Sequence, residues 1–134
     1  MKQVITDSPT RVEQNTTVQQ GKSVAIELAN KKYPETMDEY RAIMWEQHDL
    51  FCKKMLDYGP GNISLGSDLQ SPEDKKMSLT GIWFRLSDKL NRLKNLVVLG
   101  NKPNVDNEST KDTYQDISNY SIIAQIINSG KWGK

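Results

Sequence analysis

The stretch Glu108–Tyr120, Glu-Ser-Thr-Lys-Asp-Thr-Tyr-Gln-Asp-Ile-Ser-Asn-Tyr, decides how the chain folds, because its charged residues repeat at the period of a helix. Three acids and one amide recur at intervals of three or four residues: Glu108, Asp112, Asp116 and Asn119. A helix with 3.6 residues per turn places all of them on one side. That side continues with Ile123 and Ile126, which indicates burial further along. We therefore expect a helix whose acidic stripe faces a cleft.

Two interpretations of this acidic stripe compete. Ser109 and Asp112 have the spacing of a helix-capping pair, and acids are favourable in a first helical turn. Capping does not account for Asp116 and Asn119, which lie further into the helix. Like charges four residues apart destabilise a helix by ~0.2–0.5 kcal/mol per pair, so we expect a metal ion or basic side chains to offset them.

The region from residue 78 to 98 has the most regular apolar spacing and predicts a second long helix. Its apolar positions are Leu79, Ile82, Leu86, Leu90, Leu93 and Val97. One flank carries charged residues at helical spacing: Arg85, Asp88, Lys89 and Arg92. This flank is either a solvated ion network or an edge that binds phosphate. Trp83 and Phe84 are adjacent, so they cannot both face one core, and one of them is expected to pack on a ligand or a second subunit.

A further helix is expected over residues 35–56, with Thr36 as its N-cap. Gly59 and Pro60 end it, since glycine accepts positive φ and proline cannot continue a helix. Two polar residues, Gln47 and Lys54, intrude on its apolar face. Lys54 either extends to solvent at the helix end or points into the same cleft as the acidic stripe.

The domain organisation follows from these three helices. Residues 1–35 are expected to form an N-terminal arm with a short helix near residues 24–31, residues 36–130 a single α-helical domain, and residues 131–134 a tail. Residues 63–76 are expected to be a loop, within which Ser71 and Pro72 could open one helical turn. No segment alternates with a period of two, so we predict an all-α bundle, completed by association into a homo-oligomer.

Composition excludes several functional classes. The 134 residues have a net charge of +1, which gives no electrostatic basis for binding a nucleic acid polymer or an anionic membrane. No run reaches the ~18 apolar residues of a membrane span. The single cysteine, Cys52, and an N-terminus without an apolar signal segment predict a cytoplasmic protein.

Three segments together resemble a known family. They are Lys54–Gly59, Gly81–Leu96 and Glu108–Tyr120, in that order along the chain. Over residues 37–129 the chain resembles the nucleotide modification associated domain 1 family of bacteria and phages. That family is similar in turn to the all-α nucleoside triphosphate pyrophosphohydrolases of the MazG type, which are oligomers that use Mg²⁺ to cleave between the α and β phosphates.

The resemblance implies roles for particular residues. It makes Glu108, Asp112 and Asp116 ligands of Mg²⁺, with Asp112 and Asp116 catalytic. It assigns a nucleotide to the ligand-binding residues Lys54, Asp57, Tyr58, Asn62, Arg85, Asp88, Lys89, Arg92, Asn119 and Tyr120. The chain departs from the MazG-type pattern, because its first long helix offers Glu46 and Asp49 in place of a Glu-x-x-Glu pair.

Three functions remain open from the sequence. The first is a Mg²⁺-dependent nucleotide pyrophosphohydrolase. The second is a non-catalytic phage protein that binds and sequesters a nucleotide signal of host defence in the host cytoplasm. The third is a structural helical protein with both charged stripes in solvent. The first two share a ligand and differ in turnover.

Overall fold

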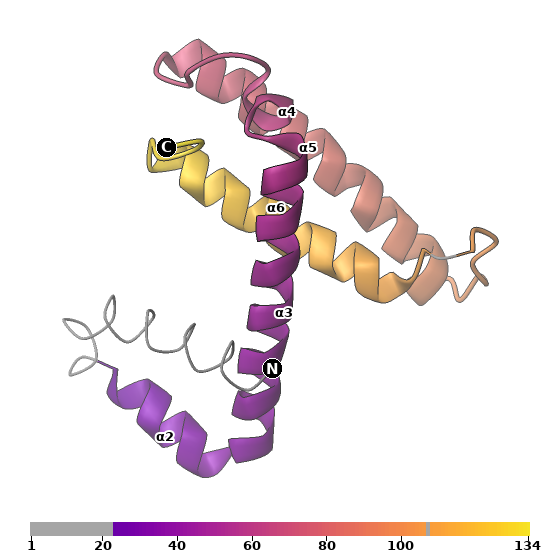
Figure 1. The fold of residues 1–134 in the computed structure, drawn as a ribbon. Coiled ribbons are helices and arrows are strands. Elements are labelled where there is room, and N and C mark those ends of the chain that lie inside the picture. The colour runs from indigo at the N-terminus through magenta and orange to yellow at the C-terminus, as the bar shows by residue number, and fades with distance from the viewer. Residues whose placement is uncertain (1–22, 107) are drawn as a thin grey trace. The chain divides into compact units, whose positions relative to one another are not determined.

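The computed structural model of the protein describes residues 23–106 and 108–134, so the first 22 residues of the expected arm lie outside it. The described elements are all helical: α2 (Val24–Lys32), α3 (Pro34–Tyr58), α4 (Gly61–Ser64), α5 (Pro72–Leu93), η1 (Lys94–Val98) and α6 (Thr110–Asn128) (Figure 1). η1 is a π-helical turn that continues from α5. The predicted all-α fold is confirmed.

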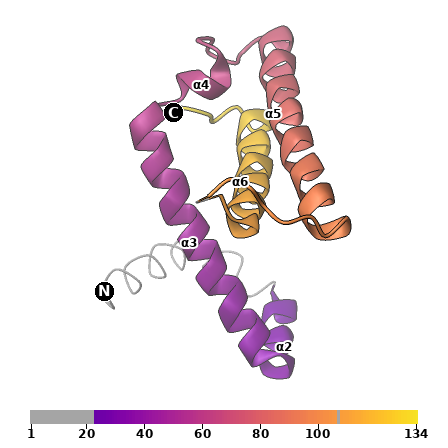
Figure 2. The ribbon, with the colours of Figure 1, turned by 90° about the vertical axis from the view of Figure 1, so that its right-hand side faces the viewer.

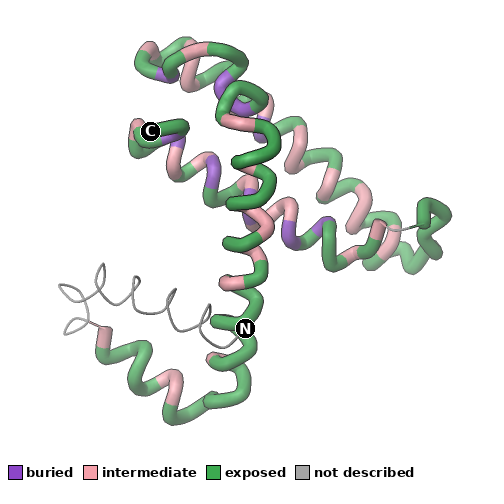
Figure 3. The backbone as a smooth tube through the Cα atoms, viewed as in Figure 1, coloured by how far each residue is buried: buried purple, intermediate pink, exposed green. Residues whose placement is uncertain are grey.

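The chain divides into two compact units, and the division falls within α3, between Met44 and Trp45. In the described part of the first unit, Arg41 donates hydrogen bonds to Asn30 and Asp38. Neither α2 nor α3 contains a buried residue, as the tube in Figure 3 shows. The expected boundary at residue 35 thus differs from the division in the structure.

The second unit contains the core. In it α6 lies between α5 and the C-terminal half of α3 (Figure 2). The buried apolar residues come from α4, the α4–α5 connection, α5, α6 and the C-terminal segment: Ile63, Leu69, Ile82, Ile123, Ile127 and Trp132. Burial of an aliphatic side chain stabilises a fold by about 1.5–3 kcal/mol, so this small cluster supplies much of the unit's stability.

Trp132 corrects the expected tail at residues 131–134. Its side chain is 8% exposed, its ring meets Phe51 edge-on at 6.3 Å, and its indole N–H donates to the Pro60 carbonyl at 3.1 Å. Gly130 adopts a φ of 76°, which lets the chain turn back after α6. The C-terminal segment therefore closes one end of the core.

The start of α5 was expected at residue 78 and lies at Pro72. Ser71 accepts a hydrogen bond from the Asp74 amide at 3.1 Å, and Pro72 occupies the first turn, where its missing N–H costs nothing. The segment 63–76, expected to be a loop, therefore contains the end of the short helix α4 and the first turn of α5. Ser78, 2% exposed, then ties the two helices together by donating to the Ile63 carbonyl at 2.6 Å.

The boundaries of the other helices follow local chemistry. α3 begins at Pro34, so the expected cap Thr36 lies inside its first turn. Gly59 has a φ of 69° directly after α3, as predicted. α6 begins at a capping box of Ser109 and Asp112, also as predicted. No helix in the described part of the chain is both long and apolar enough to span a bilayer.

Ile127 and Ile122 allow a direct test of the core, because they lie on the same helix and differ in exposure, at 0% and 44%. Ile127→Ala should lower the free energy of unfolding by about 2–5 kcal/mol, since it empties a closed site. Ile122→Ala should cost less than about 1 kcal/mol. Urea denaturation followed by circular dichroism measures both, and equal losses would mean that the core lies elsewhere.

Candidate functional site

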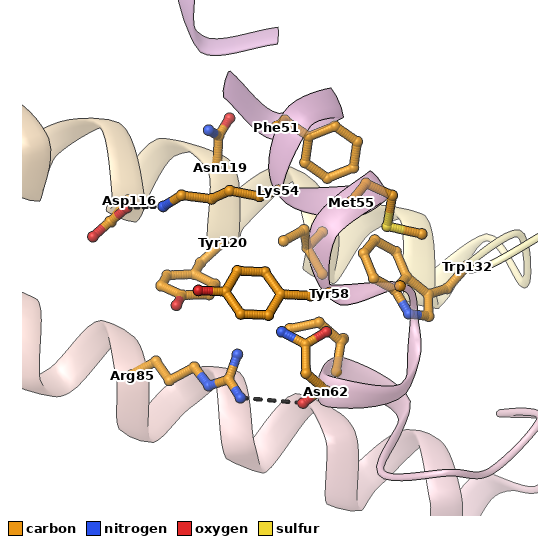
Figure 4. Close-up of a pocket in the computed structure, with 13 residues that line it drawn as sticks. Phe51, Lys54, Met55, Tyr58, Asn62, Arg85, Asp116, Asn119, Tyr120 and Trp132 are labelled. Atoms are coloured by element: carbon orange, nitrogen blue, oxygen red, sulfur yellow. Dashed lines mark hydrogen bonds and ion pairs between the residues drawn. The ribbon is translucent and has the colours of Figure 1, made fainter. Parts of the chain in front are cut away.

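A cavity of about 300 Å³ opens in the second unit, between the end of α3, α4, α5 and α6. Its charged groups, Lys54, Asp116 and Arg85, gather at one end, and Phe51, Met55 and Trp132 lie at the other (Figure 4). Tyr120 lies at the charged end beside Arg85, and Tyr58 lies between the two ends. The cavity therefore combines a polar end with an aromatic one.

Asp116 on α6 joins the two helices on either side of it. Its carboxylate lies 3.2 Å from the ammonium group of Lys54 on α3 and 2.9 Å from that of Lys89 on α5. The hydrogen bond to Asp116 raises the pKa of Lys89, and partial burial opposes this rise. Two lysine side chains thus pair with one carboxylate, and Asp116, the acid of the stripe that lines the cavity, already has partners.

Arg85 supplies a third cation at this end. Its guanidinium donates to the Asn62 carbonyl at 3.1 Å and lies over the ring of Tyr120, 5.6 Å from the ring centre. Stacking on an aromatic face holds the planar group while leaving N–H donors available at its edge. With Lys54 and Lys89 against Asp116, the polar end of the cavity carries a net positive charge of two.

Two amide side chains link α3 to α6 near the cavity. Asn119, only 9% exposed, donates to the Gln47 carbonyl at 3.3 Å. Gln47 in turn donates to the Ser118 hydroxyl at 2.8 Å. Gln47, the polar residue that intrudes on the apolar face of α3, thus has a hydrogen-bond partner for its side chain. Asn119 is fixed on the cavity wall.

The three predicted metal ligands are engaged separately. Asp112 caps α6, accepting from the Ser109 amide at 3.2 Å, and these hydrogen bonds lower the pKa of its carboxyl group. Glu108 lies 3.8 Å from Arg92, and Asp116 binds two lysines. No group of three or more acidic, histidine or cysteine side chains forms a metal site within residues 23–106 and 108–134. The proposed Mg²⁺ set therefore does not gather here, and Mg²⁺ binding stays a prediction.

Arg92 was predicted to hold phosphate, but its guanidinium binds the chain itself. It donates to the Glu108 carbonyl, to the Ser109 carbonyl at 3.1 Å and to the hydroxyl of Thr113. Thr113 is 1% exposed. Arg92 thereby fixes the first turn of α6 against α5, outside the cavity.

The remaining predicted ligand-binding residues divide by position. Six lie on the cavity wall: Lys54, Tyr58, Asn62, Arg85, Asn119 and Tyr120. Lys89 reaches the cavity only through Asp116. Asp57 and Asp88 are exposed and are not part of the wall.

Two further residues of the cavity wall were not among the predicted site residues. Phe51 and Trp132 form the aromatic end. Phe51 belongs to the predicted apolar face of the helix and Trp132 lies outside any periodic segment, so neither carried a signal for a site. Glu46 and Asp49, the acids on α3, form ion pairs with Lys111 and Lys53 at 2.7 Å each. Glu46 therefore joins α3 to α6, and Asp49 forms a surface ion pair within α3.

One comparison with known proteins gives a match. The family model described as nucleotide modification associated domain 1 matches residues 54–127, a segment that contains most of the cavity wall. No curated protein and no solved structure matches the chain.

The capping role of Asp112 predicts a pH dependence. Its pKa lies below the ordinary value of 3.8 in the folded state, so its contribution to stability is complete above that value and is lost as the pH falls through the lower, folded value. Asp112→Ala should therefore destabilise the protein at neutral pH, and the difference from wild type should shrink below about pH 4. Urea denaturation across this range measures the difference.

Ser109→Ala provides the control for this pH dependence. Ser109→Ala removes the hydroxyl but keeps the backbone amide that donates to Asp112 and lowers its pKa most, so adding Asp112→Ala to Ser109→Ala should still give a loss that shrinks at acidic pH. A difference that is constant from neutral to acidic pH would rule out the capping carboxylate as its source.

Proposed function

The chain belongs to the nucleotide modification associated domain 1 family, and from this membership and the cavity we propose that it binds a nucleoside phosphate. The observation that carries the proposal is the division of the cavity into a cationic end and an aromatic end. A nucleotide has the same division, with an anionic phosphate and a flat base.

The phosphate would lie at the end formed by Lys54, Arg85 and Asp116. Arginine and lysine donate charge-assisted hydrogen bonds to phosphate oxygens. A phosphate monoester carries about −1.5 to −2 charges at neutral pH. The net charge of plus two from Lys54, Lys89, Arg85 and Asp116 balances one such group.

The base would lie against Tyr58 and Tyr120, toward Phe51 and Trp132. Stacking of a base on an aromatic side chain contributes about 1–3 kcal/mol in nucleic-acid binding proteins. Tyr58 is 68% exposed, so its ring has room to move over a bound base. Asn119 offers amide groups for recognition of the base edge or the sugar.

The size of the cavity favours a small ligand. Ligand pockets in proteins span about 300–1,000 Å³, and this one lies at the lower limit. We infer that one nucleoside monophosphate, or one nucleotide unit of a larger signal molecule, fits inside.

Binding without turnover is the function that the geometry supports best. The pyrophosphohydrolase expected from the resemblance requires several carboxylates at one metal ion. Glu108 lies before α6, Asp112 and Asp116 lie one turn apart on it, and each of the three has separate partners. A protein that binds a nucleotide and retains it acts by sequestration, and in a phage this would remove a nucleotide signal of host defence.

Lys54 and its neighbour Lys53 test the phosphate end. Lys54 lines the cavity, whereas Lys53 pairs with Asp49 on the outer side of α3. Lys54→Ala should weaken nucleotide binding by about tenfold to a hundredfold, because a hydrogen bond to a charged group contributes about 1.5–3 kcal/mol. Lys53→Ala should leave it unchanged. Isothermal titration with the nucleotide identified below measures both.

The ligand is identified by incubating the protein with a nucleotide pool and Mg²⁺, separating bound from free molecules, and analysing both by mass spectrometry. An intact nucleotide released from the protein on denaturation supports binding. Loss of a triphosphate with formation of monophosphate and pyrophosphate would instead establish hydrolysis. Retention of no nucleotide, or equal binding by the two lysine variants, would contradict the proposal.

Asp116→Asn separates binding from catalysis. The substitution removes the carboxylate that neutralises Lys54 and Lys89, so a protein that only binds phosphate should keep or increase its affinity. A hydrolase that depends on this acid should lose turnover while still binding. Titration and the mass-spectrometric assay, applied to the same preparation, distinguish these results.

A further inference from the structure

The outer face of α5 exposes large apolar side chains. α6 packs against one side of α5 (Figure 2), and the residues that α5 leaves in solvent include Met77, Trp83, Phe84 and Leu90, which are 56–64% exposed. Large contiguous apolar patches are uncommon on monomeric proteins and usually mark an interaction surface. None of these four side chains lines the nucleotide cavity.

The order of residues on this face is symmetric about the bond between Trp83 and Phe84. Moving outward from that point in both directions, the exposed pairs at equal distance are Trp83 with Phe84, Thr80 with Ser87, Lys76 with Asn91, Met77 with Leu90, Glu73 with Lys94, and Pro72 with Asn95. At 100° per residue, all twelve positions lie within about 70° of one line along the helix. Each is exposed.

In an antiparallel pair of identical helices, positions at equal distance from the centre lie opposite each other. Four of the six pairs across such a contact of α5 and the start of η1 would match in chemistry: aromatic with aromatic, hydroxyl with hydroxyl, apolar with apolar, acid with base. The other two, Lys76 with Asn91 and Pro72 with Asn95, bring no like charges together. A parallel pair would instead place Glu73 beside a second Glu73 and Lys94 beside a second Lys94. The charged residues of this face therefore favour the antiparallel orientation.

We propose that a second copy of this chain covers this face, so that the protein forms a dimer through antiparallel α5 helices about a two-fold axis between Trp83 and Phe84. Such an axis makes both copies use the same surface, which is the commonest arrangement of homodimers. The proposal is independent of the nucleotide cavity.

The centre of the face has a fixed aromatic surface with an open groove beside it. The groove is lined by Pro72, Lys75, Lys76, Leu79, Thr80 and Trp83. Trp83 and Phe84 contact each other edge-on at 5.5 Å, which gives the centre a fixed aromatic surface.

The charged ends set the orientation of the two helices. Among the described residues, 23–106 and 108–134, neither Glu73 nor Lys94 has an ion-pair partner. Both are therefore available to a second copy. Opposite charges at the rim of an interface contribute more to specificity than to affinity. Two Glu73–Lys94 contacts would lie symmetrically at the ends of the interface.

The mass in solution tests the dimer. Light scattering on the full chain should give twice the 15.3 kDa of one chain. Trp83→Asp should reduce it to the mass of one chain at the same concentration, whereas Leu56→Asp, at a position 87% exposed on α3, should not. Circular dichroism confirms that each variant is folded. A wild-type mass of one chain, or a dimer that survives Trp83→Asp, would overturn the proposal.

Disulfide trapping tests the orientation. In a Cys52→Ser background, Thr80→Cys combined with Ser87→Cys should give a covalent dimer on oxidation. Two cysteines seven positions apart on one helix lie about 10 Å apart, too far to pair within a chain. Either cysteine alone should give little dimer, because its opposite position is then a hydroxyl. Equal trapping by the single variants would overturn the antiparallel register.

Exchange of the end charges gives a second test that does not depend on aromatic packing. Glu73→Lys should shift the dimer toward monomer, because each of the two contacts then joins like charges. Adding Lys94→Glu should restore dimerisation. Failure of the second substitution to rescue the first would show that these residues do not face each other.

Discussion

The carboxylate of Asp116 holds Lys54 of α3 on one side and Lys89 of α5 on the other, and the cavity depends on this contact. Three helices meet at a single acid that is 20% exposed. Removing either lysine would leave a partly buried carboxylate with fewer partners, which is costlier than losing a surface ion pair. The contact therefore sets the spacing of the helices and concentrates positive charge at one end of the cavity.

Hydrogen bonds from polar groups fix the position of α6. Its first turn is fixed by the capping box of Ser109 and Asp112 and by Arg92, which binds backbone carbonyls at the same place. Asn119 ties its middle to the backbone of α3, and Ile127 anchors its end in the core. Because α6 is held at its start, middle and end, the backbone positions of the side chains that line the cavity are fixed.

α5 serves the cavity and the proposed dimer with opposite faces. Ile82 is 3% exposed and Arg85 lines the cavity. Trp83 and Phe84, which lie between these two in the sequence, are exposed to solvent. The apolar residues of this helix thus cover more of its surface than the core alone buries. Leu90 and Val97, which the spacing assigned to the core, are 56% and 53% exposed. A helix with apolar residues on two faces needs a second partner to bury the outer one.

The sequence by itself determined the helices, because their signals are local: the apolar period of α5, the Ser109 and Asp112 spacing, and Gly59 after α3. It also supplied the residue types of the polar end, and seven of the site residues predicted from it, Asp116 among them, lie on the cavity wall. Only the tertiary structure decided which charges are free. Lys54 and Asp116 are 62 positions apart, and no local pattern specifies that they pair. Nor does a local pattern specify that Arg92 donates to backbone carbonyls or that Trp132 closes the cavity. Those outcomes depend on how the helices pack, and packing joins residues that periodicity treats as independent.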